Sequence, residues 1–414
     1  MGFQQGLSGL NAASKTLEAI GNNVANANTV GFKQSNVQFA DVYASSLNGA
    51  SGGQVGLGVK VSTIAQQFTQ GNITSSNNPL DVAINGGGFF RMSTNGTITY
   101  TRNGQFQLDK NGYIVNAQGS HLTGYTADLK GVLSTGAPGD LNINTADLAP
   151  QSSTKVNALL NLDSRNAIPP TTPFSATDPT SFNNATSITV FDSLGNPHVL
   201  ETFYVKTGPI PPATGNGTWD VYASNDGVML ATPNIGTLTF QTDGSIDTTA
   251  TTLPFAISLD VTSGATTPLL INVDYTGTTQ FGSSFGVNTH TQDGYTSGHL
   301  SGFSIDNDGM ITGRYTNGKA QKLGQVVMAN FTNPGALQSL GNNAWAETSG
   351  SGAALVGTPG SGNLGVLQSS ASEESNVDLT AELVNMITAQ RFYQANAQTI
   401  KTQDQVLQTL VNLR

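Results

Sequence analysis

The chain has 414 residues, which is long enough for more than one domain and for a sizeable core. Its net charge of -10 argues against nucleic acid or an anionic membrane as a partner, because both recruit clustered Lys and Arg. Only 10% of the residues are charged and none is Cys. Disulfides, thiolate metal sites and Cys nucleophiles are therefore excluded, and we expect a neutral polar surface suited to packing against copies of the same chain.

The N-terminal segment, from residue 3 to about residue 28, is predicted to form a helix. Phe3, Leu10, Leu17 and Val24 recur at intervals of seven, which is typical of a helix that packs along one stripe. The first basic residue is Lys15 and no long apolar run follows it. We therefore expect neither a cleaved signal peptide nor a membrane-spanning segment.

The stretch NNVANANTVGFK, residues 22–33, is unusual for the end of a helix, because Asn favours caps and turns over helix interiors. Asn22 and Asn26 would lie one turn apart on one helix face. We interpret them as neutral hydrogen-bonding groups between copies, which fix register as a polar residue does in a coiled coil. Gly31 is predicted to end the helix.

The middle of the chain predicts antiparallel β-structure. ITYTRNGQFQLDKNGYIV alternates apolar and polar residues, and its Asn103-Gly104 and Asn111-Gly112 pairs are type I′ hairpin signals. Residues 150–284 hold the strand candidates SITVFD, HVLETFYV, GTWDVYA and GTLTFQTDG. This segment predicts a β-sandwich or barrel that is inserted into the surrounding β-region.

The C-terminal segment predicts a second amphipathic helix, with apolar residues at alternating spacings of four and three from Leu379 to Val411. Ser375 followed by Asp378 predicts a capping box at its start. Gln390 and Asp404 interrupt the apolar stripe and would be costly to bury without partners, so we expect them to face neighbouring subunits or a channel.

Together these elements predict a multidomain α+β chain, in which the terminal helices pair as a coiled coil and two nested, mainly antiparallel β-domains lie between them. The expected domains are a terminal helical domain of residues 1–30 with 376–414, a connector of 31–70 with 350–375, an inner β-domain of 71–149 with 285–349, and an inserted outer β-domain of 150–284.

No catalytic site, cofactor or metal is expected. His290, Asp293 and His299 lack the spacing of a metal motif, so we interpret them as polar loop residues. SIDNDGM is similar to the start of a calcium loop, but Tyr315 stands where such a loop needs a bidentate Glu. A hairpin turn is the better interpretation, and the chain is not predicted to be an enzyme.

The two ends of the chain resemble the paired terminal segments of bacterial flagellar axial proteins, the rod and hook family. The resemblance rests on LSGLNAASKTLEAIGNNVANANTVGFKQS at the N-terminus and SNVDLTAELVNMITAQRFYQANAQTIKTQDQVLQTLVNL at the C-terminus. NNPLDVAINGGGFF, followed by ITYTRNGQF, is similar to the β-region that the family shares. Distal rod members of the family are shorter because they lack the inserted β-domain. A chain of 414 residues that contains the insert therefore resembles the hook members.

The resemblance implies a structural polymer outside the cell, a tube that acts as a flexible universal joint in the hook and transmits motor torque. Subunits of the family leave through the flagellar type III export apparatus without a cleaved signal peptide. They assemble beneath a hook cap. The implied partners are further copies of the chain, rod proteins and hook-filament junction proteins, with no nucleic acid and no membrane insertion.

The resemblance also assigns residues. The expected polymerisation and helix-seam residues are Leu7, Leu10, Leu17, Ile20, Val24, Leu383, Met386, Tyr393, Ile400, Leu407 and Val411, which face each other or a neighbouring copy. The expected N-terminal family motif consists of Asn22, Asn23, Asn26, Gly31 and Phe32. Two alternatives remain open: a rod component or transient scaffold of the same family, and a secreted β-rich adhesin that uses the region of Trp219 and Tyr222 as an aromatic platform.

Overall fold

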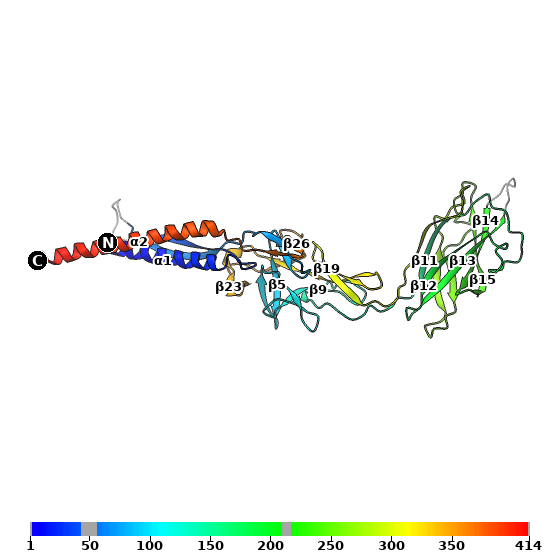
Figure 1. The fold of residues 1–414 in the computed structure, drawn as a ribbon, viewed down its shortest axis with the longest axis horizontal. Helices are drawn as coiled ribbons and strands as arrows, with labels where there is room; N and C mark the ends of the chain where they lie inside the picture. Colours follow the sequence, from blue (N-terminus) through cyan, green and yellow to red (C-terminus); the bar gives the residue numbers. More distant parts are fainter. Residues whose placement is uncertain (1, 43–55, 209–216, 413–414) are drawn as a thin grey trace. The chain divides into compact units, whose positions relative to one another are not determined.

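The computed structural model of the chain describes residues 2–42, 56–208 and 217–412, and residues 43–55 of the expected connector lie outside this part. The chain is mostly β-structure with one helix near each end and several antiparallel sheets between them (Figure 1), as the sequence predicts. It divides into two compact units. The first comprises Met1–Thr145, Ser301–Arg314 and Ala320–Arg414, and the second comprises Ala146–Leu300 and Tyr315–Lys319.

The second unit is a β-sandwich of two four-stranded sheets. One sheet has the order β16-β17-β11-β18 and the other β12-β13-β14-β15. All neighbours are antiparallel except β11 and β17, which are parallel. The strands are β11 (Lys155–Asn161), β12 (Asn184–Phe191), β13 (Pro197–Gly208), β14 (Gly217–Asn225), β15 (Val228–Phe240), β16 (Phe255–Leu259), β17 (Leu269–Asp274) and β18 (Gly286–Gln292).

The core of this sandwich forms because alternate residues of both sheets point inward. Leu160 from β11, Tyr204 from β13 and Trp219 from β14 belong to one fully buried cluster. The four strand candidates of the sequence correspond to β12, β13, β14 and β15.

The first unit contains both helices, which are α1 (Gly2–Ala25) and α2 (Leu379–Asn412). Its largest sheet follows the path β19-β20-β21-β9-β5-β6-β24-β23, to which β7, β8, β10, β22 and β25 are attached. The strands of this sheet are β5 (Phe89–Thr94), β6 (Thr97–Thr101), β7 (Gln107–Leu108), β8 (Ile114–Val115), β9 (His121–Thr126), β10 (Gly139–Asp140), β19 (Leu300–Ile305), β20 (Met310–Tyr315), β21 (Ala320–Val326), β22 (Met328–Asn330), β23 (Gln338–Gly341), β24 (Ala344–Ala346) and β25 (Leu355–Gly357).

The first unit also has three small two-stranded sheets, whose strands come from the segments that follow α1 and precede α2 in the sequence. β1 (Ser35–Val42) pairs with β2 (Gly58–Gln66), β3 (Ile73–Ser75) with β27 (Ala371–Glu373), and β4 (Val82–Asn85) with β26 (Val366–Ser369). A short 3₁₀ helix, Pro334–Ala336, completes the unit. The Gly/Ser-rich connector therefore contributes strands, because its segments before α2 pair with segments that follow α1.

The structure corrects the two predicted hairpins. β6 pairs with β5 and β24, so no hairpin forms at Asn103-Gly104. β7 and β8 do form a hairpin around Asn111-Gly112, but only Gly112 has a positive φ, of 85°. A type I′ turn needs positive φ at both positions. Instead the Asp109 carboxylate accepts hydrogen bonds from the Asn111 and Tyr113 backbone N–H groups, which fixes a longer turn.

Candidate functional site: the helix pair and the polar joint at its base

The two terminal helices lie side by side and antiparallel (Figure 1). Gly6 faces Ile400, Gly9 faces Asn396, and near the other end Asn23 approaches Glu382. A Cβ added to Gly9 would lie 2.6 Å from Asn396 Oδ1, and one added to Gly6 would lie 3.0 Å from Ile400 Cγ1. The two glycines therefore let the N-terminal half of α1 approach α2 closely.

The predicted seam residues divide into two groups. Ile20 is buried, and Leu10, Leu17, Val24, Met386 and Ile400 are partly buried. Leu7 and Tyr393 are exposed, as are Leu383 at 46%, Leu407 at 54% and Val411 at 73%. The α2 side of the seam instead follows Glu382, Ala389, Asn396 and Gln403, which recur every seven residues and are buried or partly buried. Apolar periodicity missed this row because three of its four members are polar.

The C-terminal end of α2 extends beyond α1 (Figure 1). α2 has 34 residues and α1 has 24, and with Gly6 opposite Ile400 the last turns of α2 pass the first residue of α1. We call residues 404–412 the overhang. Leu407 and Val411 lie on the same face as Ile400, because residues spaced by seven and four share a helix face. They are exposed in the single chain because α1 ends before reaching them.

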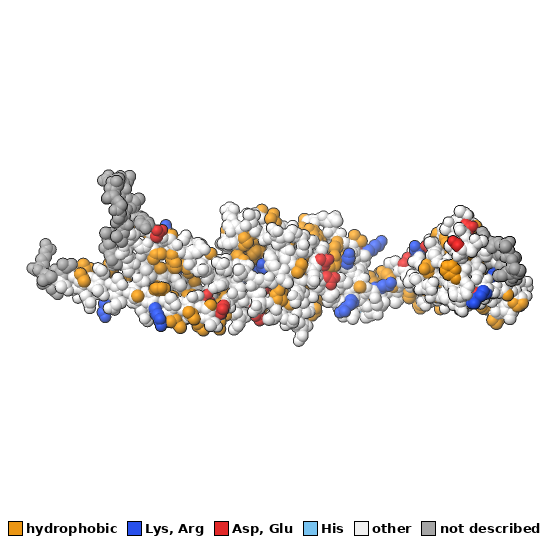
Figure 2. Space-filling view, turned by 90° about the horizontal axis from the view of Figure 1, so that it is seen from above, with side chains coloured by type: hydrophobic (Ala, Val, Ile, Leu, Met, Phe, Trp, Pro, Cys, Tyr) orange, Lys and Arg blue, Asp and Glu red, His pale blue; other side chains and the backbone are white. Residues whose placement is uncertain are grey.

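A second apolar surface lies on the side of α2 that α1 leaves uncovered. Leu383, Val384 and Ile387 are all exposed there. Figure 2 shows apolar side chains gathered over the helix end of the chain, with few charged side chains among them. Gln390 and Asp404 are exposed as well, so neither is buried without a partner in the single chain.

The start of α2 differs from the predicted capping box. The Asp378 carboxylate accepts hydrogen bonds from the backbone N–H groups of Thr380 and Ala381, at 2.9 and 3.1 Å. Asp378 is therefore the N-cap residue. Ser375 accepts from the Val377 N–H, outside the helix.

Within the N-terminal motif, Asn23 makes the structural contacts. Its side-chain amide donates to the Ser35 carbonyl and accepts from the Ser35 N–H, both at 2.9 Å, and so pairs with the first residue of β1. Asn23 is buried, whereas Asn22 is exposed. The Asn26 amide donates to the Asn22 carbonyl and to the Asn22 side-chain oxygen, both at 2.9 Å. This pair is thus already hydrogen-bonded within one chain.

α1 ends at Ala25, and a series of turns leads to Gly31, which is not the residue that directly terminates the helix. Gly31 has φ +72°, and a Cβ there would lie 2.6 Å from the Asn103 backbone nitrogen. Its own N–H donates to the Glu373 carbonyl at 2.8 Å. Phe32 beside it is buried. Gly31 and Phe32 therefore dock the turn against the β-region of the first unit.

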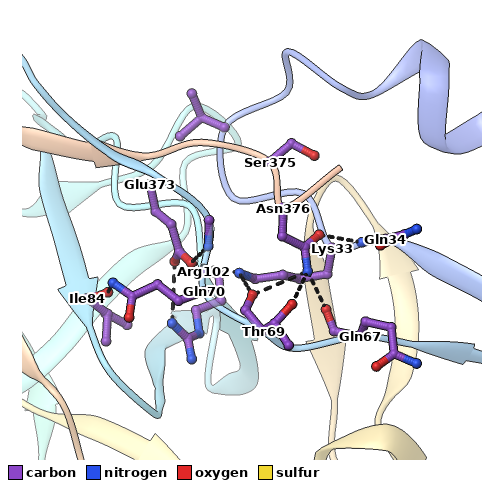
Figure 3. A network of polar contacts seen from close by, with 12 residues as sticks. Lys33, Gln34, Gln67, Thr69, Gln70, Ile84, Arg102, Glu373, Ser375 and Asn376 are labelled. Atoms are coloured by element: carbon purple, nitrogen blue, oxygen red, sulfur yellow. Dashed lines mark hydrogen bonds and ion pairs between the residues drawn. The ribbon is translucent and has the colours of Figure 1, made fainter. Parts of the chain in front are cut away.

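Lys33, the residue after Phe32, belongs to a buried ionic cluster with Arg102 and Glu373 (Figure 3). Lys33 Nζ lies 2.7 Å from Glu373 Oε1 and donates to the Thr69 carbonyl at 2.8 Å. Arg102 Nη1 lies 3.3 Å from Glu373 Oε2, and the Gly71 N–H donates to Glu373 Oε1 at 3.0 Å. The side chains of Lys33 and Glu373 are completely buried. The cluster ties together the segment after α1, the segment between β2 and β3, the residue that follows β6 and the segment before α2.

Two cations share the one carboxylate of this cluster. Burial lowers the pKa of Lys33, and the Coulomb attraction and hydrogen bond of Glu373 oppose that shift. Burial also lowers the pKa of Arg102. The Arg102 guanidinium carbon lies 5.3 Å from the centre of the Phe89 ring, which adds a cation–π contact. Glu373 is thus the only acidic group that balances both cations in the contacts described for this cluster.

A hydrogen-bond network of mostly uncharged groups continues from the ionic cluster to the helices (Figure 3). The Gln34 N–H donates to Asn376 Oδ1 at 2.8 Å, and the Asn376 amide donates to the Gln67 carbonyl at 2.8 Å. The Gln34 amide donates to Glu382 Oε1 at 2.6 Å. We call this set the polar joint, which consists of Asn23, Lys33, Gln34, Arg102, Glu373, Asn376 and Glu382.

Sequence reasoning identified only Asn23 of these residues. The other members belong to no periodic pattern or local motif in the sequence. They meet because strands that follow α1 pair with strands that precede α2. The signal available in the sequence was the rarity of charge, which makes Lys33 and Glu373 conspicuous near the inner ends of the two helical segments.

The candidate metal residues do not come together. Asp293 accepts hydrogen bonds from Thr154 and from the Lys155 N–H, and Asp306 accepts the Gly309 N–H in a turn between β19 and β20. In the described part of the chain, no three His, Cys, Asp or Glu residues are grouped as metal ligands. No helix there is both long and apolar enough to cross a membrane. Trp219 is fully buried, so it cannot serve as the aromatic platform of an adhesin.

Four family descriptions match this chain in sequence order. Residues 3–33 match the flagella basal body rod protein family, and residues 83–158 match the flagellar hook protein FlgE/F/G D1 domain. Residues 161–295 match the flagellar basal body protein FlaE D2 domain, and residues 368–413 match the C-terminal region of the flagellar basal body rod FlgEFG proteins.

Full-length relatives narrow the family. The chain is 44% identical to the flagellar hook protein FlgE of Escherichia coli K12 and to that of Salmonella typhimurium, with all of each chain covered. The chain belongs to the FlgE flagellar hook protein family. The FlgE of Borreliella burgdorferi is 35% identical and covers 99% of this chain and 98% of its own.

The expected family resemblance is therefore confirmed, and the chain is a structural subunit of the flagellar hook. The crystal structure of Helicobacter pylori flagellar hook protein FlgE2 has a similar fold, with a TM-score of 0.55, 15% identity, and coverage of 73% of this chain and 99% of that one. The relatives are hook proteins rather than enzymes, and they do not favour the rod or adhesin alternatives.

Replacing Asn23 should weaken the joint between α1 and β1. Asn23→Ala removes the hydrogen-bond partner of both Ser35 backbone groups, and we expect a loss of about 1–3 kcal/mol in the free energy of local opening. Hydrogen exchange at the Ser35 amide of the full chain measures this loss. Asn22→Ala is the matched control, because Asn22 is exposed. Equal exchange rates in the two variants would contradict the role assigned to Asn23.

Removing the charge of Glu373 should destabilise the first unit selectively. Glu373→Gln leaves Lys33 and Arg102 buried without a counter-charge, which costs about 3–5 kcal/mol. The chain has two Trp, and Trp345 lies in the first unit, so denaturant unfolding followed by Trp345 fluorescence in a Trp219→Phe background isolates the effect.

Lys15→Ala provides the control for this substitution. Lys15 and Glu18 form a solvent-exposed ion pair, whose loss should cost less than about 1 kcal/mol. A Glu373→Gln chain as stable as the Lys15→Ala chain would show that the buried cluster does not hold the unit together.

Proposed function

We propose that the helix pair is the polymerisation element of this hook subunit, and that copies assemble through it into a helical tube. The observation that supports this proposal is the apolar surface of α2 that α1 does not cover. Leu383, Val384 and Ile387 lie on the uncovered side of α2, and Leu407 and Val411 lie on the overhang. Apolar side chains gain about 25 cal/mol for each Å² that is removed from water. Neighbouring helices in an assembly are the surfaces that can cover them.

In this proposal the two helices are an incomplete bundle. The predicted coiled-coil pairing involves the buried and partly buried residues Leu10, Leu17, Ile20, Val24, Met386 and Ile400, and the exposed members of the predicted seam complete their packing against other copies. Leu7, Leu383, Tyr393, Leu407 and Val411 belong to this second group. Gln390 and Asp404 are then available to neighbouring subunits or to the tube interior.

The outer parts of the subunit would have a different mechanical role. The chain carries a low proportion of charged residues, so contacts between β-regions of neighbouring copies would be neutral and polar. Contacts of that kind can be exchanged at low cost as the hook bends. We propose that this property lets the tube act as a universal joint while the helices stay packed.

Assembly also implies partners outside the polymer. We propose that the subunit leaves the cell through the flagellar type III export apparatus without a cleaved signal peptide, and that it adds beneath a hook cap. The tube would meet rod proteins at one end and hook-filament junction proteins at the other. The termini that pair in α1 and α2 are the segments available for these contacts.

Polar substitutions on the open face of α2 should impair assembly without unfolding the subunit. We expect Leu383→Ser with Ile387→Ser to reduce the number of hooks seen by electron microscopy on cells that express the variant. The thermal stability of the purified subunit should change little, because both side chains are already exposed at 46% and 53%.

Val228→Ser is a matched control, because Val228 is 70% exposed but belongs to the second unit. Hooks of normal number and length in the double variant would remove the open face of α2 from the polymerisation surface.

A further inference from the structure

A groove runs along the helix pair at the end nearer the polar joint. It has a volume of about 320 Å³ and is bounded by α1, β1 and α2. Thr16, Ala19 and Ile20 of α1 line one wall, Val37 of β1 the second, and Ala389 and Phe392 of α2 the third. Glu382 is the only charged residue that lines it, and its carboxylate is engaged by Gln34 and Asn23.

The apolar surface of the groove continues onto the β1–β2 ribbon. Val37 pairs with Ile64 and Phe39 pairs with Val61 across the two strands. Directly paired residues share one face of a sheet, so Val37 and Ile64 lie together, whereas the register shift between Gln38 and Phe39 interrupts the alternation of faces before the second pair. Phe39, Val61 and Ile64 are exposed at 41%, 38% and 53%. The groove wall at Val37 therefore continues onto the exposed side chain of Ile64.

The overhang of α2 has the complementary chemistry. Val406, Leu407 and Val411 are exposed, and Asp404, the only acidic residue in the described range 404–412, accepts a hydrogen bond from Gln408 at 3.0 Å. Leu407 and Val411 also continue the helix face on which Ile400 meets α1. A surface like that of α1, built from small and aliphatic side chains, is what this face already packs against within the chain.

The overhang cannot reach the groove of its own chain. Phe392 and Asp404 lie on one continuous helix and are separated by about 18 Å along its axis, at 1.5 Å per residue. The groove and the overhang are therefore two different surfaces at opposite ends of the helix pair. A contact between two different surfaces leaves one of each free, so further copies can add, and an open array forms when the rotation between copies does not close a ring.

We propose that the overhang of one copy seats in the groove between α1, β1 and α2 of the next copy. The α1 wall of the groove, with Thr16, Ala19 and Ile20, takes the place of the α1 surface that the overhang lacks in its own chain. Leu407 and Val411 enter the groove, and Phe392 and Val37 in its walls pack against them. This inference rests on the proposed function, because it names the contact by which the helix pairs join.

Disulfide crosslinking in the assembled hook tests this contact directly, since the chain has no cysteine of its own. Leu407→Cys is combined with Thr388→Cys, which lies in the groove lining. The two positions are about 28 Å apart along one helix, so they cannot crosslink within a chain. We expect oxidised hooks to give a ladder of covalent multimers on a non-reducing gel.

Thr409→Cys with Thr388→Cys is the matched control, because Thr409 points away from the Leu407 face of the same helix turn. It should give little or no ladder. If Leu407→Cys itself reduces assembly, Val411→Cys on the same face replaces it, with the same expectation.

The outcomes separate this inference from the proposed function. Hooks that assemble but give no ladder with either Leu407→Cys or Val411→Cys, or that give an equal ladder with Thr409→Cys, overturn the docking of the overhang and leave polymerisation through the helices intact. Failure of the unmodified chain to form a tube overturns both.

Discussion

The ion cluster around Glu373 is the interaction on which the arrangement of the first unit depends. One completely buried carboxylate holds Lys33 from the segment after α1 and Arg102, the residue that follows β6. A buried ion pair adds little net stability compared with apolar residues of the same size, but breaking it is costly. We infer that its main effect is specificity. It allows one way of joining the helical ends to the β-region, because any other pairing would strand a buried charge.

The position of the helices follows from this cluster. Gly31 must be glycine for its N–H to reach the Glu373 carbonyl without a clash against Asn103. Asn23 and Gln34 then connect α1 and β1 to Glu382, one turn into α2. The inner ends of both helices are fixed by polar contacts, whereas their outer ends meet through Gly6, Gly9 and Ile400. The helix pair is thus held firmly at its base, and its apolar sides remain open for other copies.

The sequence predicted those parts of the structure that depend on local pattern. Both helices, the four strands β12 to β15 and the separate sandwich follow from periodicity of 3.6 or 2, and the structure contains them. The family could also be inferred from the two terminal segments. The polar joint could not, because Lys33 and Glu373 are 340 residues apart and meet only through strand pairing. The predicted α2 seam of Leu383, Met386, Tyr393, Ile400, Leu407 and Val411 omits the polar row for a related reason. Glu382 and Asn396 of that row are polar, so an apolar repeat does not detect them.

The difference between buried and exposed charges explains why so few residues of the chain are charged. A hook subunit repeats every surface contact along the tube, so an exposed charge would face its own copies many times, whereas a buried charge with a fixed partner causes no such repulsion. Lys33 and Glu373 are completely buried, and Lys206 in the second unit is buried with its ammonium donating to the Ser164 and Asn166 carbonyls. Charge is used inside each unit to fix chain segments, and neutral side chains cover much of the surface. A subunit built in this way can be rigid internally while its contacts with neighbours remain exchangeable.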